Sequence, residues 1–216
     1  SSRDMWIQAR KVISSSEEYC LLLSSFTNEK QSKFTSEQIQ DARSNSRNGN
    51  LIISVGEPDR TESSSYMEKS EQYISELMDT VKDYVSVIGG VAAAPTHAKV
   101  VVSDSGMLFI TTCNLLSSDP TKFVLESGFL IDDVQLSSKI VELILEESWI
   151  PKKCNSEVEK LRFSLSMRDF PKADTTILRE KLEKSLKSLK SGGRNAIFGL
   201  VALDNQLQKI SEMFLK

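Results

Sequence analysis

The sequence contains one histidine and only three cysteines among its 216 residues. Cys20, Cys113 and Cys154 are far apart and form no CxxC pair. A structural zinc site takes four Cys or His ligands at short, regular spacings, so this composition argues against one. We therefore expect reduced thiols in a cytoplasmic protein, with no metal site and no cofactor.

Long apolar runs are also missing. No segment reaches the roughly 20 apolar residues that cross a bilayer, and the first residues lack the charged-then-apolar plan of a signal peptide. With 39% hydrophobic and 26% charged residues, the chain is expected to be a soluble globular protein without a membrane span. The chain does not start with Met, which suggests a piece of a longer protein.

Charge is unevenly distributed along the chain. Residues 1–150 carry 13 basic and 22 acidic side chains, whereas residues 151–216 carry 14 basic and 8 acidic ones. A basic tail on an acidic body favours contact with nucleic acid or another acidic partner. A solvated, lysine-rich helix face explains the same asymmetry equally well. The basic side chains that would contact phosphates are Lys152, Lys153, Lys181, Lys184, Lys187, Lys190 and Arg194.

Apolar periodicity predicts an α/β fold in residues 1–150 and a helical appendage in residues 151–216. Helices alternate with strands, and a hairpin of two strands follows the third helix. Because crossover helices join parallel strands while a hairpin is antiparallel, we expect a mixed β-sheet flanked by helices on both faces. The expected helices cover 3–15, 35–47, 66–83, 133–147, 153–166, 174–190 and 194–215. The expected strands cover 19–23, 51–55, 85–88, 97–103, 107–113 and 127–131.

Four polar side chains fall on the predicted hairpin. His97 and Lys99 are two residues apart on one strand, and Thr112 and Asn114 are two apart at the end of the next. Side chains two apart on a strand share a face, so the hairpin would gather an imidazole, an ammonium, a hydroxyl and an amide. These groups suit phosphoryl transfer: the imidazole attacks or protonates, the cation neutralises phosphoryl charge, and the neutral donors orient the phosphate.

The spacing resembles the signature of the phospholipase D superfamily, HxKxxxxD followed by GSxN. His97, Lys99 and Asp104 match the first part, while Thr112 and Asn114 stand at the Ser and Asn positions of the second. The resemblance covers residues 1–150 and implies a phospholipase D-like fold with a single His-Lys-Asp motif.

Two further positions bear on this resemblance. Thr111 replaces the glycine of the family pattern, and a β-branched residue there is expected to narrow the phosphate pocket. Glu126 stands where family members often carry an acid near the histidine, which makes it a candidate for orienting His97. Together with the five motif positions it completes the candidate catalytic set, in which Asp104 is expected to be more structural than chemical.

The resemblance also implies a mechanism and an oligomeric state. Catalysis in the family uses two histidines without a metal: one forms a phosphohistidine, and the other protonates the leaving oxygen and then activates water. Since His97 is the only histidine of this chain, the expected active form is a homodimer in which two copies of His97 face each other across a two-fold axis.

Single-motif members of the family are often nucleases, so we expect a nuclease acting on DNA or RNA. Other domains or subunits of a larger defence or processing assembly are further expected partners. Two alternatives remain. One is a phospholipase or other lipid phosphodiesterase. The other is a non-catalytic phospholipase D-like interaction module of a larger protein.

Overall fold

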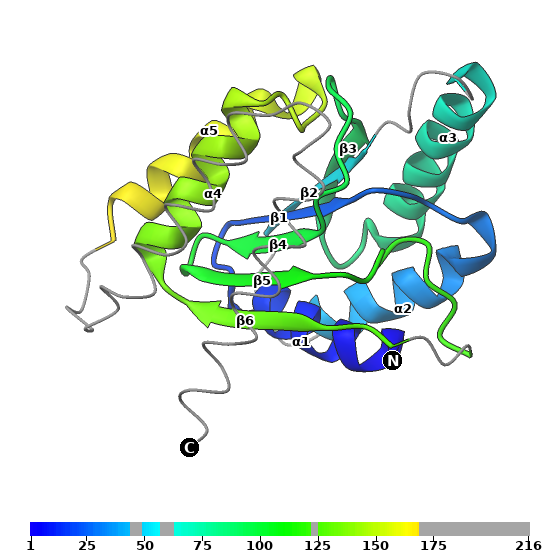
Figure 1. Ribbon diagram of the computed structural model, residues 1–216, viewed down its shortest axis with the longest axis horizontal. Helices are drawn as coiled ribbons and strands as arrows, with labels where there is room; N and C mark the ends of the chain where they lie inside the picture. The colour runs from blue at the N-terminus through cyan, green and yellow to red at the C-terminus, as the bar shows by residue number, and fades with distance from the viewer. Residues whose placement is uncertain (44–48, 57–62, 122–124, 169–216) are drawn as a thin grey trace. The chain divides into compact units, whose positions relative to one another are not determined.

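A computed structural model describes residues 1–43, 49–56, 63–121 and 125–168 (Figure 1). The expected helices at 174–190 and 194–215 lie outside these ranges. None of the helices described combines the length and apolar character that crossing a membrane requires. The helices are α1 (Ser2–Ser15), η1 (Glu29–Gln31), α2 (Ser32–Arg43), α3 (Ser63–Val81), α4 (Val134–Glu146), η2 (Lys152–Cys154) and α5 (Asn155–Ser166), where η marks a 3₁₀ turn.

The strands form one six-stranded sheet in the order β3-β2-β1-β4-β5-β6. Strands β3, β2 and β1 form one half of the sheet and are parallel. In the other half, β4 is antiparallel to β1, β5 to β4, and β6 to β5. The predicted mixed sheet and the predicted hairpin are both confirmed. The strands are β1 (Tyr19–Ser24), β2 (Asn50–Val55), β3 (Ser86–Val91), β4 (Val100–Ser103), β5 (Met107–Thr111) and β6 (Gly128–Asp132).

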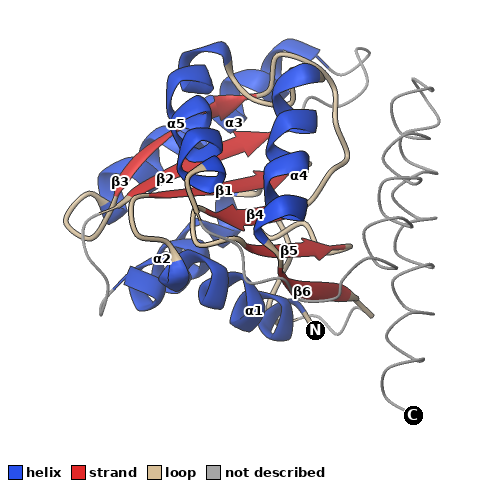
Figure 2. Ribbon diagram, turned by 90° about the vertical axis from the view of Figure 1, so that its left-hand side faces the viewer, coloured by secondary structure: helices blue, strands red, loops and turns tan. Residues whose placement is uncertain are grey.

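Helices cover both faces of the sheet (Figure 2). One core cluster joins apolar residues of α1, α2 and α3 to inward residues such as Leu22 and Ile53. Because strand side chains alternate, the equally buried Leu21 and Ile52 point to the opposite face, where α5 contacts β1 and α4 contacts β4 and β5. Central strands buried on both faces explain why β1 and β2 are continuous apolar runs.

The third strand is longer than predicted. We expected it to end at residue 88, before two glycines, but β3 continues through Gly89 to Val91. A Cβ on Gly89 would lie 2.6 Å from the carbonyl oxygen of Ile53 and 3.2 Å from Cγ2 of Ile74. The glycine therefore allows α3 and β2 to pack closely on the strand, and it does not end the strand.

The compact unit extends beyond the predicted domain boundary at residue 150 and comprises Ser1–Arg168. Helix α5 contacts α4 and β1, and it buries Val158, Leu161 and Leu165. The amphipathic pattern predicted this helix, but the pattern alone did not indicate which sheet or helix it packs on.

Candidate active site

The His97 segment leads directly into the hairpin. β4 begins at Val100, three residues later than predicted, and pairs with β5 so that Val100 faces Ile110. The pairing extends one residue before the start of β4, because the Thr111 amide donates to the Lys99 carbonyl at 3.1 Å. Ala98 is buried whereas His97 is exposed, so the alternation expected of a strand persists through this extended stretch.

This segment lies at the carboxyl end of β1, since Leu23 near that end pairs with Val100 at the start of β4. The chain passes from β1 to β2 and β3 on one side, then returns to add β4 on the other side of β1. Ligands of open α/β sheets bind outside the carboxyl ends of strands at such a change of direction. Topology and motif therefore indicate the same edge of the sheet.

The backbone carrying His97 is held against β2. A Cβ on Gly56, the residue after β2, would lie 2.2 Å from the Thr96 carbonyl oxygen, so only glycine permits this approach. The Thr96 hydroxyl in turn accepts the Ala98 amide at 3.0 Å. These contacts fix the extended segment that carries His97 and Lys99, just before β4.

Lys99 is half-buried beside His97. Its ammonium donates to the His97 carbonyl oxygen at 2.8 Å. Burial lowers the pKa of Lys99 below the ordinary lysine value, while the nearby carboxylate of Glu126 opposes this shift. The site therefore contains a partly desolvated cation close to an acid from the loop before β6.

Thr112 and Glu126 are brought together by the pairing of β5 with β6, in which Thr111 faces Gly128. The Thr112 amide donates to the Ser127 carbonyl at 2.9 Å, and its hydroxyl accepts the Ser127 amide at 3.1 Å. The same hydroxyl donates to the Glu126 carboxylate in a short hydrogen bond. Thr112 thus holds Glu126 on the side of the site that carries Lys99.

Thr111 and Asn114, the remaining positions compared with the GSxN part of the signature, differ in their surroundings. Thr111 is buried, and its hydroxyl accepts the Cys113 amide at 3.0 Å and donates to the Ser127 carbonyl at 2.9 Å. Thr111, which replaces the glycine of the signature, therefore stabilises the turn after β5. Oδ1 of Asn114 is buried and, within the described part of the chain, has no hydrogen-bond partner. An unsatisfied buried acceptor costs about 1–3 kcal/mol, so this amide oxygen is suited to a ligand or water.

Asp104 does not lie with the other candidates. It follows the far end of β4, and at roughly 3.3 Å per residue it is on the order of 20 Å from His97. Its carboxylate is buried and accepts the amides of Glu17, Glu18 and Tyr19 at 2.9, 2.8 and 3.0 Å. Its inclusion in the catalytic set is therefore corrected: Asp104 ties the loop between α1 and β1 to the hairpin corner, as its expected structural role implies.

An aromatic residue in contact with His97, and a second aromatic residue in contact with the first, were not identified from the sequence. The rings of Phe26 and His97 meet edge to face with centroids 5.7 Å apart, and those of Phe26 and Tyr66 do so at 6.2 Å. Phe26 comes two residues after β1, at the edge where ligands bind, and this position is the signal that could have revealed it. Tyr66, on α3, had no such signal, because its proximity depends on how α3 packs.

The predicted phosphate-contacting lysines are only partly described. Lys152 and Lys153 form the start of η2, and Lys153 pairs with Glu71 of α3 at 3.1 Å. The remaining basic residues proposed for this role, Lys181, Lys184, Lys187, Lys190 and Arg194, lie outside the described residues.

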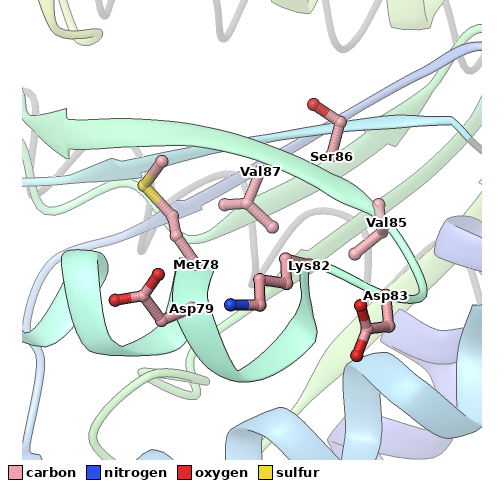
Figure 3. A pocket seen from close by; sticks show the side chains of 7 residues that line it. All are labelled: Met78, Asp79, Lys82, Asp83, Val85, Ser86 and Val87. Atoms are coloured by element: carbon pink, nitrogen blue, oxygen red, sulfur yellow. The ribbon is translucent and has the colours of Figure 1, made fainter.

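Cys113 follows Thr112 directly and therefore adjoins the site. Cys20, Cys113 and Cys154 are free and buried, and no three His, Cys, Asp or Glu side chains within the described ranges could together hold a metal ion. A concave surface of about 410 Å³ lies at the end of α3 and the start of β3 (Figure 3). Since β3 is parallel to β1, this concavity is at the opposite edge of the sheet from His97. Its lining residues are Met78, Asp79, Lys82, Asp83, Val85, Ser86 and Val87.

No protein-family model and no curated protein sequence matches the chain. Among solved structures it is similar to Nuc, a phospholipase D family member from Salmonella typhimurium, at 15% identity and a TM-score of 0.44 over 65% of this chain and 84% of that one. NucT from Helicobacter pylori is 18% identical, with a TM-score of 0.47 over 69% of this chain and 91% of that one. Phosphatidylserine synthase from Haemophilus influenzae is 11% identical, with a TM-score of 0.47 over 78% of this chain and 43% of that one. Each of these similarities is one of fold.

Proposed function

We propose that this protein is a metal-independent phosphodiesterase of the phospholipase D type and that its substrate is a nucleic acid, DNA or RNA. The proposal rests on one observation. At the carboxyl end of β1 lie the exposed His97, the half-buried Lys99 and the hydrogen-bonded pair of Thr112 and Glu126. A nucleophile, a cation and an oriented acid at one ligand-binding edge are the groups that phosphoryl transfer needs.

In the proposed reaction, a ring nitrogen of His97 attacks phosphorus. The P–N bond forms as the bond from phosphorus to the leaving oxygen breaks, and that oxygen takes a proton. Water then attacks the phosphohistidine, releasing the phosphate product and restoring the imidazole. Lys99 has three N–H donors, of which one goes to the His97 carbonyl, so the others can neutralise the phosphoryl oxygens.

Glu126 has a positioning role in this proposal. The hydroxyl of Thr112 fixes its carboxylate, and the carboxylate favours the charged form of Lys99. It thereby preserves the cation in a partly desolvated site. That Glu126 also orients the imidazole of His97 stays a prediction.

The leaving oxygen needs a proton donor, and the sequence offers no second histidine. We infer that the donor is the partner subunit's His97 in a symmetric homodimer, because a two-fold axis beside the site would bring the two exposed imidazoles together. Each chain would then supply half of a composite site.

The test is cleavage of labelled single- and double-stranded DNA and RNA in excess EDTA. Wild type is compared with His97→Ala and with Lys82→Ala, a matched change of an exposed residue at the opposite edge of the sheet. We expect EDTA-resistant cleavage that Lys82→Ala retains and His97→Ala loses by at least about a thousandfold. Full activity in His97→Ala would contradict the proposal. Hydrolysis of phospholipid vesicles without nucleic-acid cleavage would instead establish the lipid alternative.

A further inference from the structure

Phe26 and Tyr66 form an aromatic pair, and the Phe26 ring contacts the His97 imidazole. Phe26 comes two residues after β1, and Tyr66 lies in the first turns of α3. Phe26 is in edge-to-face contact with both His97 and Tyr66. Both Phe26 and Tyr66 are only half-buried, and neither belongs to the core cluster between the sheet and α1, α2 and α3. Part of the surface of each ring is therefore exposed beside the site and available to a ligand.

Hydrogen bonds fix this pair in place. The Tyr66 hydroxyl accepts the Thr27 amide at 3.3 Å and lies 3.5 Å from the Ser25 carbonyl oxygen, to which it donates. The hydroxyls of Thr27 and Ser70 are also bonded, at 3.1 Å. The loop after β1 is thus tied to α3 at several points. A ring already held in position loses little freedom when a ligand packs on it.

We propose that Phe26 and Tyr66 form a stacking platform for a nucleobase adjacent to the scissile phosphate, which makes single-stranded nucleic acid the preferred substrate. The inference rests on the proposed function and names its substrate class. Every base has a π-face, so stacking on aromatic side chains binds single strands with little regard to sequence. In a duplex the bases are stacked on one another, and an enzyme reaches them only after unstacking.

The position of Phe26 supports this assignment over a general apolar contact. Its ring touches the imidazole itself, at 5.7 Å between centroids, so a base on the platform would have its own phosphate beside the nucleophile. The platform would bind the base while Lys99 binds the phosphate, and the two contacts would align a single nucleotide for attack.

The experiment measures kcat/KM of the full chain on three substrates: a single strand, the matching duplex, and the same single strand with abasic nucleotides flanking the cleaved bond. Wild type is compared with Phe26→Ala, Phe26→Leu and Tyr84→Leu, a change of an exposed aromatic residue just before β3, at the opposite end of the sheet. We expect wild type to prefer the single strand over both other substrates. Phe26→Ala and Phe26→Leu should lose about tenfold on the base-bearing strand and almost nothing on the abasic one, whereas Tyr84→Leu should remain near wild type on both.

Equal losses of the Phe26 variants on base-bearing and abasic strands would overturn the platform and would make Phe26 a positioning residue for His97. A wild-type preference for duplex would overturn it as well. In both cases the proposed nuclease function would stand. Vesicle hydrolysis by a wild type that cleaves no nucleic acid would overturn both proposals together.

Discussion

Asp104 stabilises the fold at a distance from the chemistry. Its buried carboxylate accepts three backbone amides of the loop before β1. Burial lowers the pKa of the nearby Arg43, and the negative charge of Asp104 opposes that shift. Removal of the carboxylate would leave three amides without their acceptor and weaken the compensation of a buried cation.

We therefore expect Asp104→Ala to lower the free energy of unfolding by on the order of 3 kcal/mol. Urea denaturation would measure the loss. The matched control is Asp132→Asn, at an exposed position at the end of β6, which should change the unfolding free energy by less than about 0.5 kcal/mol. A fully stable Asp104→Ala protein would contradict this account of the motif aspartate.

The lowered pKa of Lys99 predicts how activity should depend on pH at the alkaline end. Burial lowers its pKa in the folded protein, so the activity that depends on its cation should fall at a pH below about 10.4, the value for an unperturbed lysine. Arginine stays charged in this range. The alkaline limb of kcat/KM should therefore move to higher pH in Lys99→Arg, and pH profiles of the two proteins would measure the difference. Superimposable limbs would show that another group titrates.

The same shift has a consequence for stability. Between the lowered pKa and the ordinary one, unfolded Lys99 binds more protons than folded Lys99, so this residue's contribution makes folding more favourable as pH rises through that interval.

At the scale of elements, short apolar runs and helical periodicity identified each described strand and α-helix, because a buried strand or helix face is apolar. Spacing along a strand also placed His97 with Lys99, since side chains two apart share a face. Asp104 is far from His97 because the six residues between them are in extended conformation along β4 and the segment before it. Phe26 and Tyr66 meet because α3 is bonded to the loop after β1, and no local sequence pattern encodes that contact.

The glycine in β3 shows why element ends were less predictable. In the sequence Gly89 predicts the end of a strand. In the structure it lies within β3, where its lack of a side chain allows close contact with Ile53 and Ile74. We expect Gly89→Ala to destabilise the protein by about 1–3 kcal/mol through overpacking. Chemical denaturation would measure this. The control, Ser86→Ala at the exposed start of the same strand, should change stability by less than about 0.5 kcal/mol. Equal effects of the two changes would contradict the close approach of α3.

At the scale of the whole molecule, the proposed chemistry requires two histidines and each chain has one. Co-expression of equal amounts of wild type and His97→Ala would form mixed dimers. If a site needs His97 from both chains, roughly one quarter of the dimers are active, whereas independent sites would retain roughly half of the activity. Activity assays on the mixture, with sedimentation analysis of the oligomer, distinguish the two. A strictly monomeric chain that cleaves phosphodiesters would exclude the composite site.

The most direct test of the central claim is to trap the covalent intermediate. Labelled nucleic acid is mixed with the full chain in EDTA, the reaction is quenched within a turnover, and the digested protein is analysed by mass spectrometry. We predict an acid-labile phosphoramidate on the peptide containing His97, absent in His97→Ala. Product formation without any adduct, or with an adduct on another residue, would contradict His97 as the nucleophile.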